Sequence, residues 1–333
     1  MSHQTEPAAE AGRRTPRMRA RNSQSHEASA AASLQTAVSF TDTQRLVRFL
    51  ERLTAGSAAN WPRLLGLEAG EFATLTGGRN VSRIHFGNEF CERLLPSRTK
   101  VETALKTATA CGLGFGLALP ILTDDGIAQA DELLGAMPDG TEVTVNDWGL
   151  MRRMGRRFPA LRAIAGRLLC KILKEPRVPS ATYMELGGHG FMTPGLEALF
   201  ARMGVGRVEI DVPPFARTQD LSAPRLRVSA HVPFGFATTG RICRIGNLRQ
   251  PGARKFATDH SCARECLTYL TGMTAPREPG NDPMVIFQRG NTTFYRHTAA
   301  MTAALAEAVA AGTVDRVVIS GDWNENRSSD LDA

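Results

Sequence analysis

Short runs rich in Val, Ile, Leu and Phe alternate with longer helical patterns from about residue 80 onward. Continuous apolar runs of this kind are typical of strands buried on both faces of a parallel sheet. The predicted strands are Val81–Phe86, Phe115–Leu119, Glu142–Val145, Leu161–Ala165, Ala181–Leu186, Val208–Val212, Leu226–Ala230, Val285–Gln288 and Val317–Ser320. Between them, apolar residues at helical spacing predict the helices Lys100–Cys111, Ile127–Ala136, Trp148–Arg157, Pro194–Met203 and Thr298–Ala311.

This alternation predicts an α/β fold with a parallel sheet. About eight strands in succession favour a TIM-like (β/α) barrel, closed or partly open, over a doubly wound sheet. The glycines Gly112, Gly114 and Gly116 precede a strand instead of joining a strand to a helix. They therefore do not predict a dinucleotide-binding turn.

The two ends of the chain differ from this pattern. Residues 1–38 are rich in Ala, Ser and Arg without sustained apolar periodicity, and we predict a disordered tail. Residues 39–75 are predicted to form an N-terminal helical segment, with an amphipathic helix at Thr43–Leu53. Residues 76–325 are assigned to the barrel with its cysteine-bearing loop region, and residues 326–333 to a flexible C-terminus.

Cysteine spacing gives the clearest chemical signal. Cys262 and Cys266 stand four residues apart, and Cys243 lies nineteen residues before Cys262. If a helical turn begins at this point, two cysteines at this spacing face the same side and can bind one metal centre. Cys91 lies just beyond a predicted strand, at the rim where barrels build their sites.

Zinc and a [4Fe–4S] cluster both remain open for these four thiols. Zinc sites commonly use two paired cysteine hooks, whereas this chain has one hook and two distant cysteines. A cluster is larger and accepts ligands from separate loops, so the spacing slightly favours a cluster. His260 could replace one ligand, and Cys111 and Cys170 are interpreted as buried small hydrophobic residues.

Composition and charge narrow the class of protein. The chain is 42% hydrophobic and 22% charged, which suits a globular protein with a sizeable core. It has no run of ~20 apolar residues and no apolar signal region, so we expect a cytoplasmic protein. The net charge of +7 is compatible with a polyanionic partner, but a solvated tail and a solvated helix face are the favoured explanation. One arginine cluster lies on a predicted helix, at Arg152, Arg153, Arg156 and Arg157.

Several stretches together resemble the U32 peptidase-like family: IHFGNEFCERL, TVNDWGLMRRM with FPALRAIAGRLL, SAHVPFGFATTGRICRIG, and CARECLTY. The resemblance covers about residues 80–320 and is greatest to the ubiquinone-biosynthesis members. It implies a [4Fe–4S] cluster bound by the four cysteines that match the family pattern, Cys91, Cys243, Cys262 and Cys266. The loop before Cys262 departs from the family by carrying a basic run, Arg249, Arg254 and Lys255.

The same resemblance implies a heterodimer with a UbiU-like protein and hydroxylation of a quinone precursor without oxygen, with prephenate as oxygen donor. The predicted residues of such a site are Asp147, Arg167, Glu209, Asp211 and His231. Each also has a structural interpretation: Asp147 as a helix N-cap, Arg167 with Glu209 as an ion pair, and His231 as a hydrogen-bonded structural histidine.

Two other functions stay open. Related family members hydroxylate RNA bases, and the arginine cluster on helix 148–157 would favour RNA binding. The second alternative is a noncatalytic protein. Its cluster would be only structural, or would pass electrons to a catalytic partner. Peptidase chemistry is disfavoured, because the chain has no G-x-S-x-G elbow, no H-E-x-x-H motif and no poised Cys–His pair once four cysteines bind a cluster.

Overall fold

The fold is a closed parallel barrel. The computed structural model describes residues 34–55, 61–65, 67–170, 172, 174–176, 180–182, 192–258, 261–275 and 284–322. Eight strands pair in the order β1-β12-β7-β6-β5-β4-β3-β2, all in parallel. They are β1 (Gln35–Phe40), β2 (Arg83–Gly87), β3 (Gly114–Leu119), β4 (Glu142–Val145), β5 (Arg162–Ala165), β6 (Arg207–Ile210), β7 (Arg227–Val232) and β12 (Arg316–Ser320). The predicted TIM-like barrel is confirmed, in its closed form.

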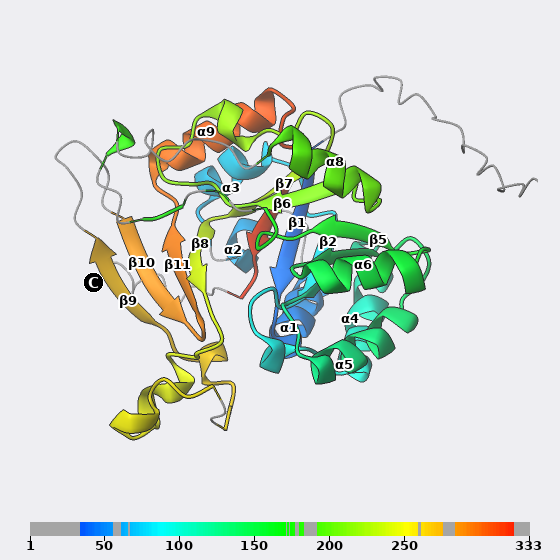
Figure 1. Cartoon of the computed structure of the whole chain (residues 1–333). Helices are drawn as coiled ribbons and strands as arrows, with labels where there is room; N and C mark the ends of the chain where they lie inside the picture. Colours follow the sequence, from blue (N-terminus) through cyan, green and yellow to red (C-terminus); the bar gives the residue numbers. More distant parts are fainter. Residues whose placement is uncertain are drawn as a thin grey trace, which may run out of the picture. The chain divides into compact units, whose positions relative to one another are not determined.

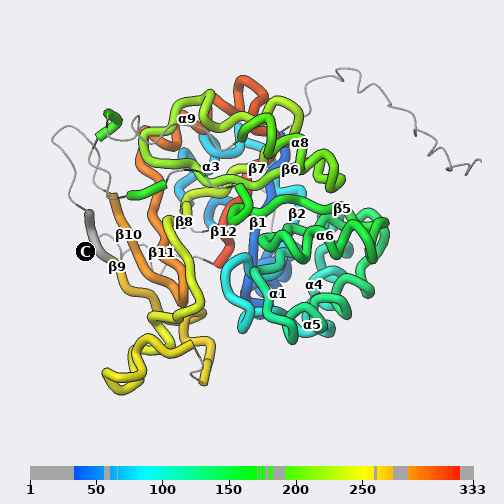
Figure 2. The backbone as a smooth tube through the Cα atoms, viewed as in Figure 1, coloured from blue at the N-terminus to red at the C-terminus, as the bar shows by residue number. Residues whose placement is uncertain are grey.

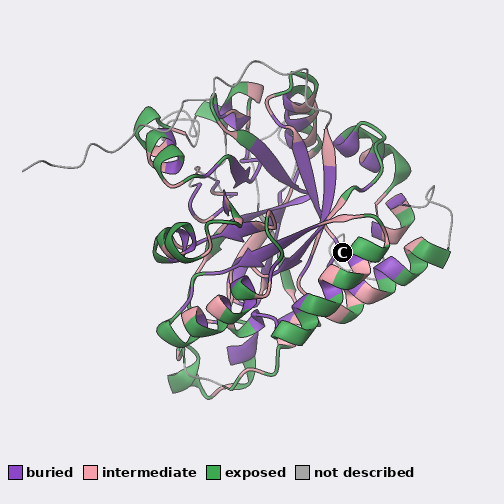
Figure 3. Ribbon diagram, turned by 90° about the vertical axis from the view of Figure 1, so that its right-hand side faces the viewer, coloured by how far each residue is buried: buried purple, intermediate pink, exposed green. Residues whose placement is uncertain are grey.

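Helices surround this barrel and bury their apolar sides against the strands (Figure 1; Figure 3). They are α1 (Thr43–Ala55), α2 (Trp61–Leu65), α3 (Ala69–Thr76), α4 (Arg98–Ala110), α5 (Asp124–Gly135), α6 (Trp148–Arg157), α8 (Pro194–Arg202) and α9 (Ala299–Ala310). After β6 the connection carries the 3₁₀ turn η3 (Thr218–Leu221). Because helices cover the outside and side chains fill the inside, β6 is buried at every position.

Pairing of the first strand with the last closes the ring. Gln35 stands opposite Arg316, and β1 and β12 lie side by side in Figure 2. The barrel therefore begins at Gln35, within the segment predicted as a tail, and not at residue 76. The sequence QTAVSF holds polar residues at three of six positions, so its strand signal was too weak to separate it from the polar segment before it.

A second sheet of four antiparallel strands lies within the seventh connection of the barrel. Its order is β8-β11-β10-β9, and these strands stand side by side in Figure 1. They are β8 (Phe234–Thr239), β9 (Thr271–Ala275), β10 (Met284–Arg289) and β11 (Thr292–Arg296). The predicted strand Val285–Gln288 thus belongs to this small sheet and not to the barrel. Because β8 follows β7 directly, the insertion begins at the rim where β7 ends.

The other predicted elements are recovered within one to three residues at most boundaries. The predicted strand Ala181–Leu186 lies mostly outside the described residues, as do the C-terminal segment 326–333 and residues 1–33 of the predicted tail. The helical segment predicted at 39–75 contains α1, α2 and α3. In the part of the chain that is described, every helix is too short or too polar to cross a bilayer.

Candidate functional site at the mouth of the barrel

A cavity of about 90 Å³ opens at the C-terminal ends of the barrel strands. The ends of β1, β2, β3, β6, β7 and β12 form one wall, and the turn between β10 and β11 forms another. Parallel strands all end at the same rim, so residues far apart in the sequence meet there. The polar side chains in its wall include His85, Glu89, Arg167, Glu209, His231, Arg289, Asn291 and Asp322.

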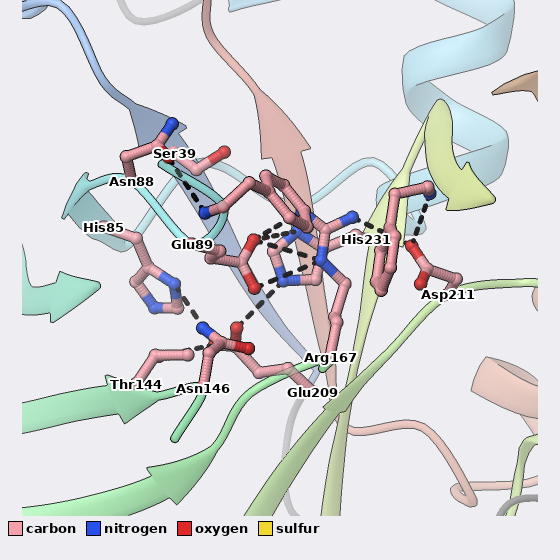
Figure 4. A network of polar contacts seen from close by, with 12 residues as sticks. Ser39, His85, Asn88, Glu89, Thr144, Asn146, Arg167, Glu209, Asp211 and His231 are labelled. Carbon is pink, nitrogen blue, oxygen red and sulfur yellow. Dashed lines mark hydrogen bonds and ion pairs between the residues drawn. The ribbon is translucent and has the colours of Figure 1, made fainter. Parts of the chain in front are cut away.

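Arg167 joins two buried carboxylates at this mouth (Figure 4). Its Nε donates to Glu89 Oε2 at 3.0 Å, and its Nη1 donates to Asp211 Oδ1 at 2.8 Å. Lys174 donates to the other oxygen of Asp211. The sequence suggested an ion pair of Arg167 with Glu209. The observed partners of Arg167 are Glu89 and Asp211, whereas Glu209 lies against His231.

The charges of this network support one another. Burial alone would lower the pKa of Arg167, but Glu89 and Asp211 raise it above its ordinary value. Burial would raise the pKa of Asp211, but Lys174 and Arg167 lower it to about 2. Burial lowers the pKa of Lys174 to about 8, against the attraction of Asp211. Groups this deeply buried stay charged only through such pairing.

Glu209 is the centre of a second polar group. Thr144 Oγ1 donates to Glu209 Oε1 at 3.1 Å, and His231 Nε2 lies 2.9 Å from Glu209 Oε2. Burial would raise the pKa of Glu209, but His231 and His85 lower it well below its usual range. Burial lowers the pKa of His85 to about 3, so this imidazole is neutral at neutral pH.

Three of these side chains lie close enough for a single ion. Ligand atoms of Glu89, Glu209 and His231 all lie within 4.8 Å of one another. Two carboxylates and an imidazole form a donor set that divalent cations accept. In this structure, however, Arg167 already pairs with Glu89 and His231 lies within hydrogen-bond distance of Glu209, so the group is equally explained as a polar network.

Aromatic rings cover the network on the side of the insertion. The guanidinium of Arg167 lies 5.0 Å from the ring centre of Phe90 and 5.6 Å from that of Phe236. Lys174 Nζ lies 3.2 Å from the ring centre of Phe236. These rings keep water from the ion pairs, which strengthens the pairs.

The four predicted cysteine ligands come from two parts of the chain. Cys91 follows β2, whereas Cys243, Cys262 and Cys266 lie between β8 and β9. Cys91 and Cys266 line the cavity itself. Burial raises the pKa of Cys91, Cys243 and Cys266, and other cysteines of the set raise it further. All four thiols are therefore within electrostatic range of one another.

Backbone N–H groups point at three of these sulphurs. The N–H of Gly246 donates to Cys243 Sγ at 3.2 Å. The N–H of Arg264 donates to Cys262 Sγ at 3.4 Å. Two backbone N–H groups that follow Cys91 lower the pKa of its thiol, against the effect of burial. Such donors stabilise a thiolate, which is the form that binds metal.

The turn at residues 289–291 connects the segments that carry the cysteines. Asn291 Nδ2 donates to the carbonyl oxygens of Phe90 and Gly240, each at 2.7 Å. Phe90 immediately precedes Cys91. Gly240 lies just before the segment that contains the other three cysteines. One amide therefore fastens the barrel rim to the insertion.

The same turn also holds the last cysteine of the set. Arg289 Nε donates to the carbonyl oxygen of Cys266 at 2.9 Å. The carbonyl oxygen of Gly290 accepts a hydrogen bond from the N–H of Arg244 at 3.0 Å. On the opposite side, Arg289 Nη1 lies 3.8 Å from Asp322 Oδ2, just beyond β12.

Not every predicted site residue reaches this mouth. Asp147 does not line the cavity; its carboxylate accepts a hydrogen bond from the N–H of Leu150 at 2.9 Å and caps α6. Cys170 is fully buried in the core, as predicted, and Cys111 is half-buried where α4 ends. His260 lies outside the described residues.

The pair Cys262 and Cys266 does not stand on an α-helical turn. Arg264, between them, has a left-handed backbone with φ of 59°, and the 3₁₀ turn η6 (Glu265–Leu267) follows. The expectation of a helical turn was wrong in this detail. The thiol of Cys266 nevertheless lies within electrostatic range of Cys91, Cys243 and Cys262.

Several residues of the site were not predicted. Glu89 stands two positions after β2 and two before Cys91, and its place at a strand end was a usable signal. Lys174, Arg289 and Asn291 carried no such signal, because their partners lie far away in the sequence.

Comparisons with known proteins add only distant likenesses in shape. The sequence matches no protein-family model and no curated protein. Among solved structures, an Oleispira antarctica phosphodiesterase in complex with sn-glycerol-3-phosphate has a TM-score of 0.37 and 10% identity, covering 90% of this chain and 97% of that one. The C-terminal domain of a putative chitinase from Desulfitobacterium hafniense DCB-2 has a TM-score of 0.38 and 8% identity, with 89% and 97% covered. The spore cortex-lytic enzyme SleL of Bacillus megaterium QM B1551 has a TM-score of 0.39 and 8% identity, with 90% and 73% covered. Nothing about function follows from these values.

Proposed function

We propose that this chain is a UbiV-like, [4Fe–4S]-binding subunit of an oxygen-independent hydroxylase that acts on a quinone precursor in anaerobic ubiquinone biosynthesis. Its partner in the proposed heterodimer is a UbiU-like protein. One observation carries the proposal: Cys91 and Cys266 line the same cavity as Arg167 and His231. A cluster bound by these thiols would therefore face a polar, largely buried pocket in which a substrate can be held.

The cysteines fit a cluster better than a zinc ion. Four sulphurs that bind one zinc at about 2.3 Å lie about 3.8 Å from one another. Among the residues that the structure describes, no three cysteine sulphurs come within 4.8 Å of one another. They nevertheless affect one another's pKa. An intermediate spacing of this kind, with N–H donors at three sulphurs, suits the larger cubane.

The cluster would supply one-electron chemistry or a Lewis-acidic iron. The protein's own residues would bind and orient the substrate and exclude water. His231, held at Nε2 by Glu209, can keep or pass a proton at the edge of the cavity. Arg289 also lines the cavity and is proposed to bind a carboxylate such as those of prephenate, the proposed oxygen donor, whereas Arg167 is held by Glu89 and Asp211.

Metal analysis of the anaerobically purified chain tests this proposal. We expect about four irons and four acid-labile sulphides per chain, with visible absorption that is lost in Cys262→Ala. Cys111→Ala is the matched control, because Cys111 is half-buried and lies at the end of α4. It should keep its iron. One zinc per chain and no sulphide would contradict the proposal.

A reconstituted heterodimer tests the activity itself. The chain with a UbiU-like partner should hydroxylate a quinone precursor under anaerobic conditions, and neither chain alone should do so. We place this reaction in the cytoplasm, where reducing conditions keep thiols available. RNA-base hydroxylation gains no support from α6, since Arg153 and Arg157 both pair with Asp131 and the helix presents fewer uncompensated cations than its sequence suggests.

A further inference from the structure

We propose that the outer face of the loop at residues 240–258 docks a small acidic electron-carrier protein, which reduces the cluster held by the four cysteines. The inference rests on the proposed function, because it names the electron source for that same cluster. The 240–258 loop follows β8 and precedes the Cys262 hook. In Figure 1 it extends beyond the lower ends of β8, β10 and β11.

The charge of this loop is of one sign. Residues 240–258 contain five cations and no Asp or Glu. The five are Arg241, Arg244, Arg249, Arg254 and Lys255, and all are exposed. A surface of this kind attracts acidic proteins over a distance and aligns them as they approach.

Apolar side chains lie among these cations. Leu248 is 65% exposed and Phe256 is 80% exposed. Both line a groove of about 430 Å³, together with Arg241, Arg244 and Lys255. Transient protein interfaces combine a small apolar centre with a charged rim, and those of redox partners are among the smallest.

The groove is formed by the chain neighbours of a proposed cluster ligand. Arg241 and Arg244 line it, and Cys243 stands between them in the chain with a buried thiol. A carrier docked in the groove would contact the residues on both sides of Cys243 in the chain, which places its redox centre on the side of the cluster that Cys243 holds. A nucleic acid would gain nothing from that position, which is why we favour a protein donor over RNA.

The electron balance of the step is simple. The reduced carrier is oxidised by one electron, and the cluster accepts that electron. No covalent bond forms or breaks in the transfer, and no proton must move.

Stopped-flow reduction of the anaerobic, cluster-loaded chain tests the proposal. The probe is a reduced plant-type [2Fe–2S] ferredoxin, which is a small acidic one-electron donor. We expect the second-order rate constant to fall as ionic strength rises, and to fall about tenfold or more in the double variant Arg241→Glu/Lys255→Glu. The matched control is Arg152→Glu/Arg156→Glu, which reverses two charges on α6 and should leave the rate unchanged.

Iron content and full reduction by excess dithionite must be the same in both variants, which establishes that the cluster is intact. An unchanged rate in the Arg241→Glu/Lys255→Glu variant would overturn the docking surface. So would tight binding of a single-stranded RNA that the same variant abolishes, with no effect on ferredoxin. A wild-type chain purified without iron would instead contradict the proposed function. The docking surface would still be tested on that iron-free chain, because binding of ferredoxin to it should weaken as salt rises.

Discussion

Gly290 lies directly against Cys266: a Cβ added at Gly290 would stand 3.1 Å from Cys266 Cβ and 3.4 Å from its sulphur. Its φ of 62° is also in the left-handed region. The turn between β10 and β11 can therefore approach the cysteine only because its central residue has no side chain.

We expect Gly290→Ala to reduce iron content strongly. The added methyl group pushes Cys266 away, and the left-handed backbone costs a further ~1–2 kcal/mol. Gly312→Ala separates the two effects, since Gly312 has a φ of 73° and nothing within 4 Å of the added Cβ. That control should lose stability but keep its iron. Equal iron in both variants would contradict a close fit at Gly290.

Replacement of Asn291 by Ala should loosen the attachment of the insertion to the barrel. The variant loses the hydrogen bonds to Phe90 and Gly240, which together contribute about 2 kcal/mol. Iron per chain and the urea midpoint should both fall. Gln129→Ala removes one hydrogen bond from a side-chain amide to the Pro96 carbonyl, which does not join the insertion to the barrel, and should leave iron unchanged.

Asp211→Asn should be among the most destabilising single changes in the barrel. It removes the carboxylate charge that pairs with the buried cations Arg167 and Lys174. The free energy of unfolding should fall by about 3–5 kcal/mol, because a buried charge is left without its partner. Asp131→Asn is the surface comparison, because its partners Arg153 and Arg157 are partly exposed. Urea unfolding of Asp131→Asn should show that the free energy of unfolding falls by about 1 kcal/mol or less. Similar losses in the two variants would argue against a tightly paired network at the mouth.

Acid should destabilise the fold through buried neutral histidines. Burial lowers the pKa of His297 to about 3, and neither ring nitrogen has a hydrogen-bond partner in the structure. Between pH 6.5 and 3 the unfolded chain binds a proton at this side chain and the folded chain does not. The free energy of unfolding therefore falls as pH falls through that window.

His297→Gln should remove part of this dependence. From pH 7 to pH 5 the wild type should lose about 2 kcal/mol more than the variant, as measured by urea unfolding at both pH values. A variant with the same pH dependence as the wild type would show that His297 is protonated in the fold.

Apolar patterning identified most of the barrel because its strands are buried on both faces. The runs around Val143, Val208 and Val317 contain enough β-branched residues to stand out from the helices. In the small sheet β10 stood out, but β8 and β11 did not. β8 and β11 read FGFATT and TTFYR, and polar threonines at several positions hide a sheet that is only partly buried.

The site was predictable where chemistry and strand ends coincide. Arg167, Glu209 and His231 were expected and meet at the mouth. Asp147 was expected on the same grounds but caps a helix, because a carboxylate directly before a helix satisfies a free N–H more readily than it reaches the cavity. The part played by Asn291 depends on two long-range hydrogen bonds, which no local pattern encodes.

Closure of the ring through β1 and β12 has a consequence for biosynthesis. The ribosome releases β1 before the other barrel strands and β12 after them, so a nascent chain can hold seven of the eight strands and still have two open edges, on β1 and on β7. Open edges of this kind recruit other strands and promote aggregation. Translation that stops before Arg316 would thus yield an exposed sheet and not a smaller barrel.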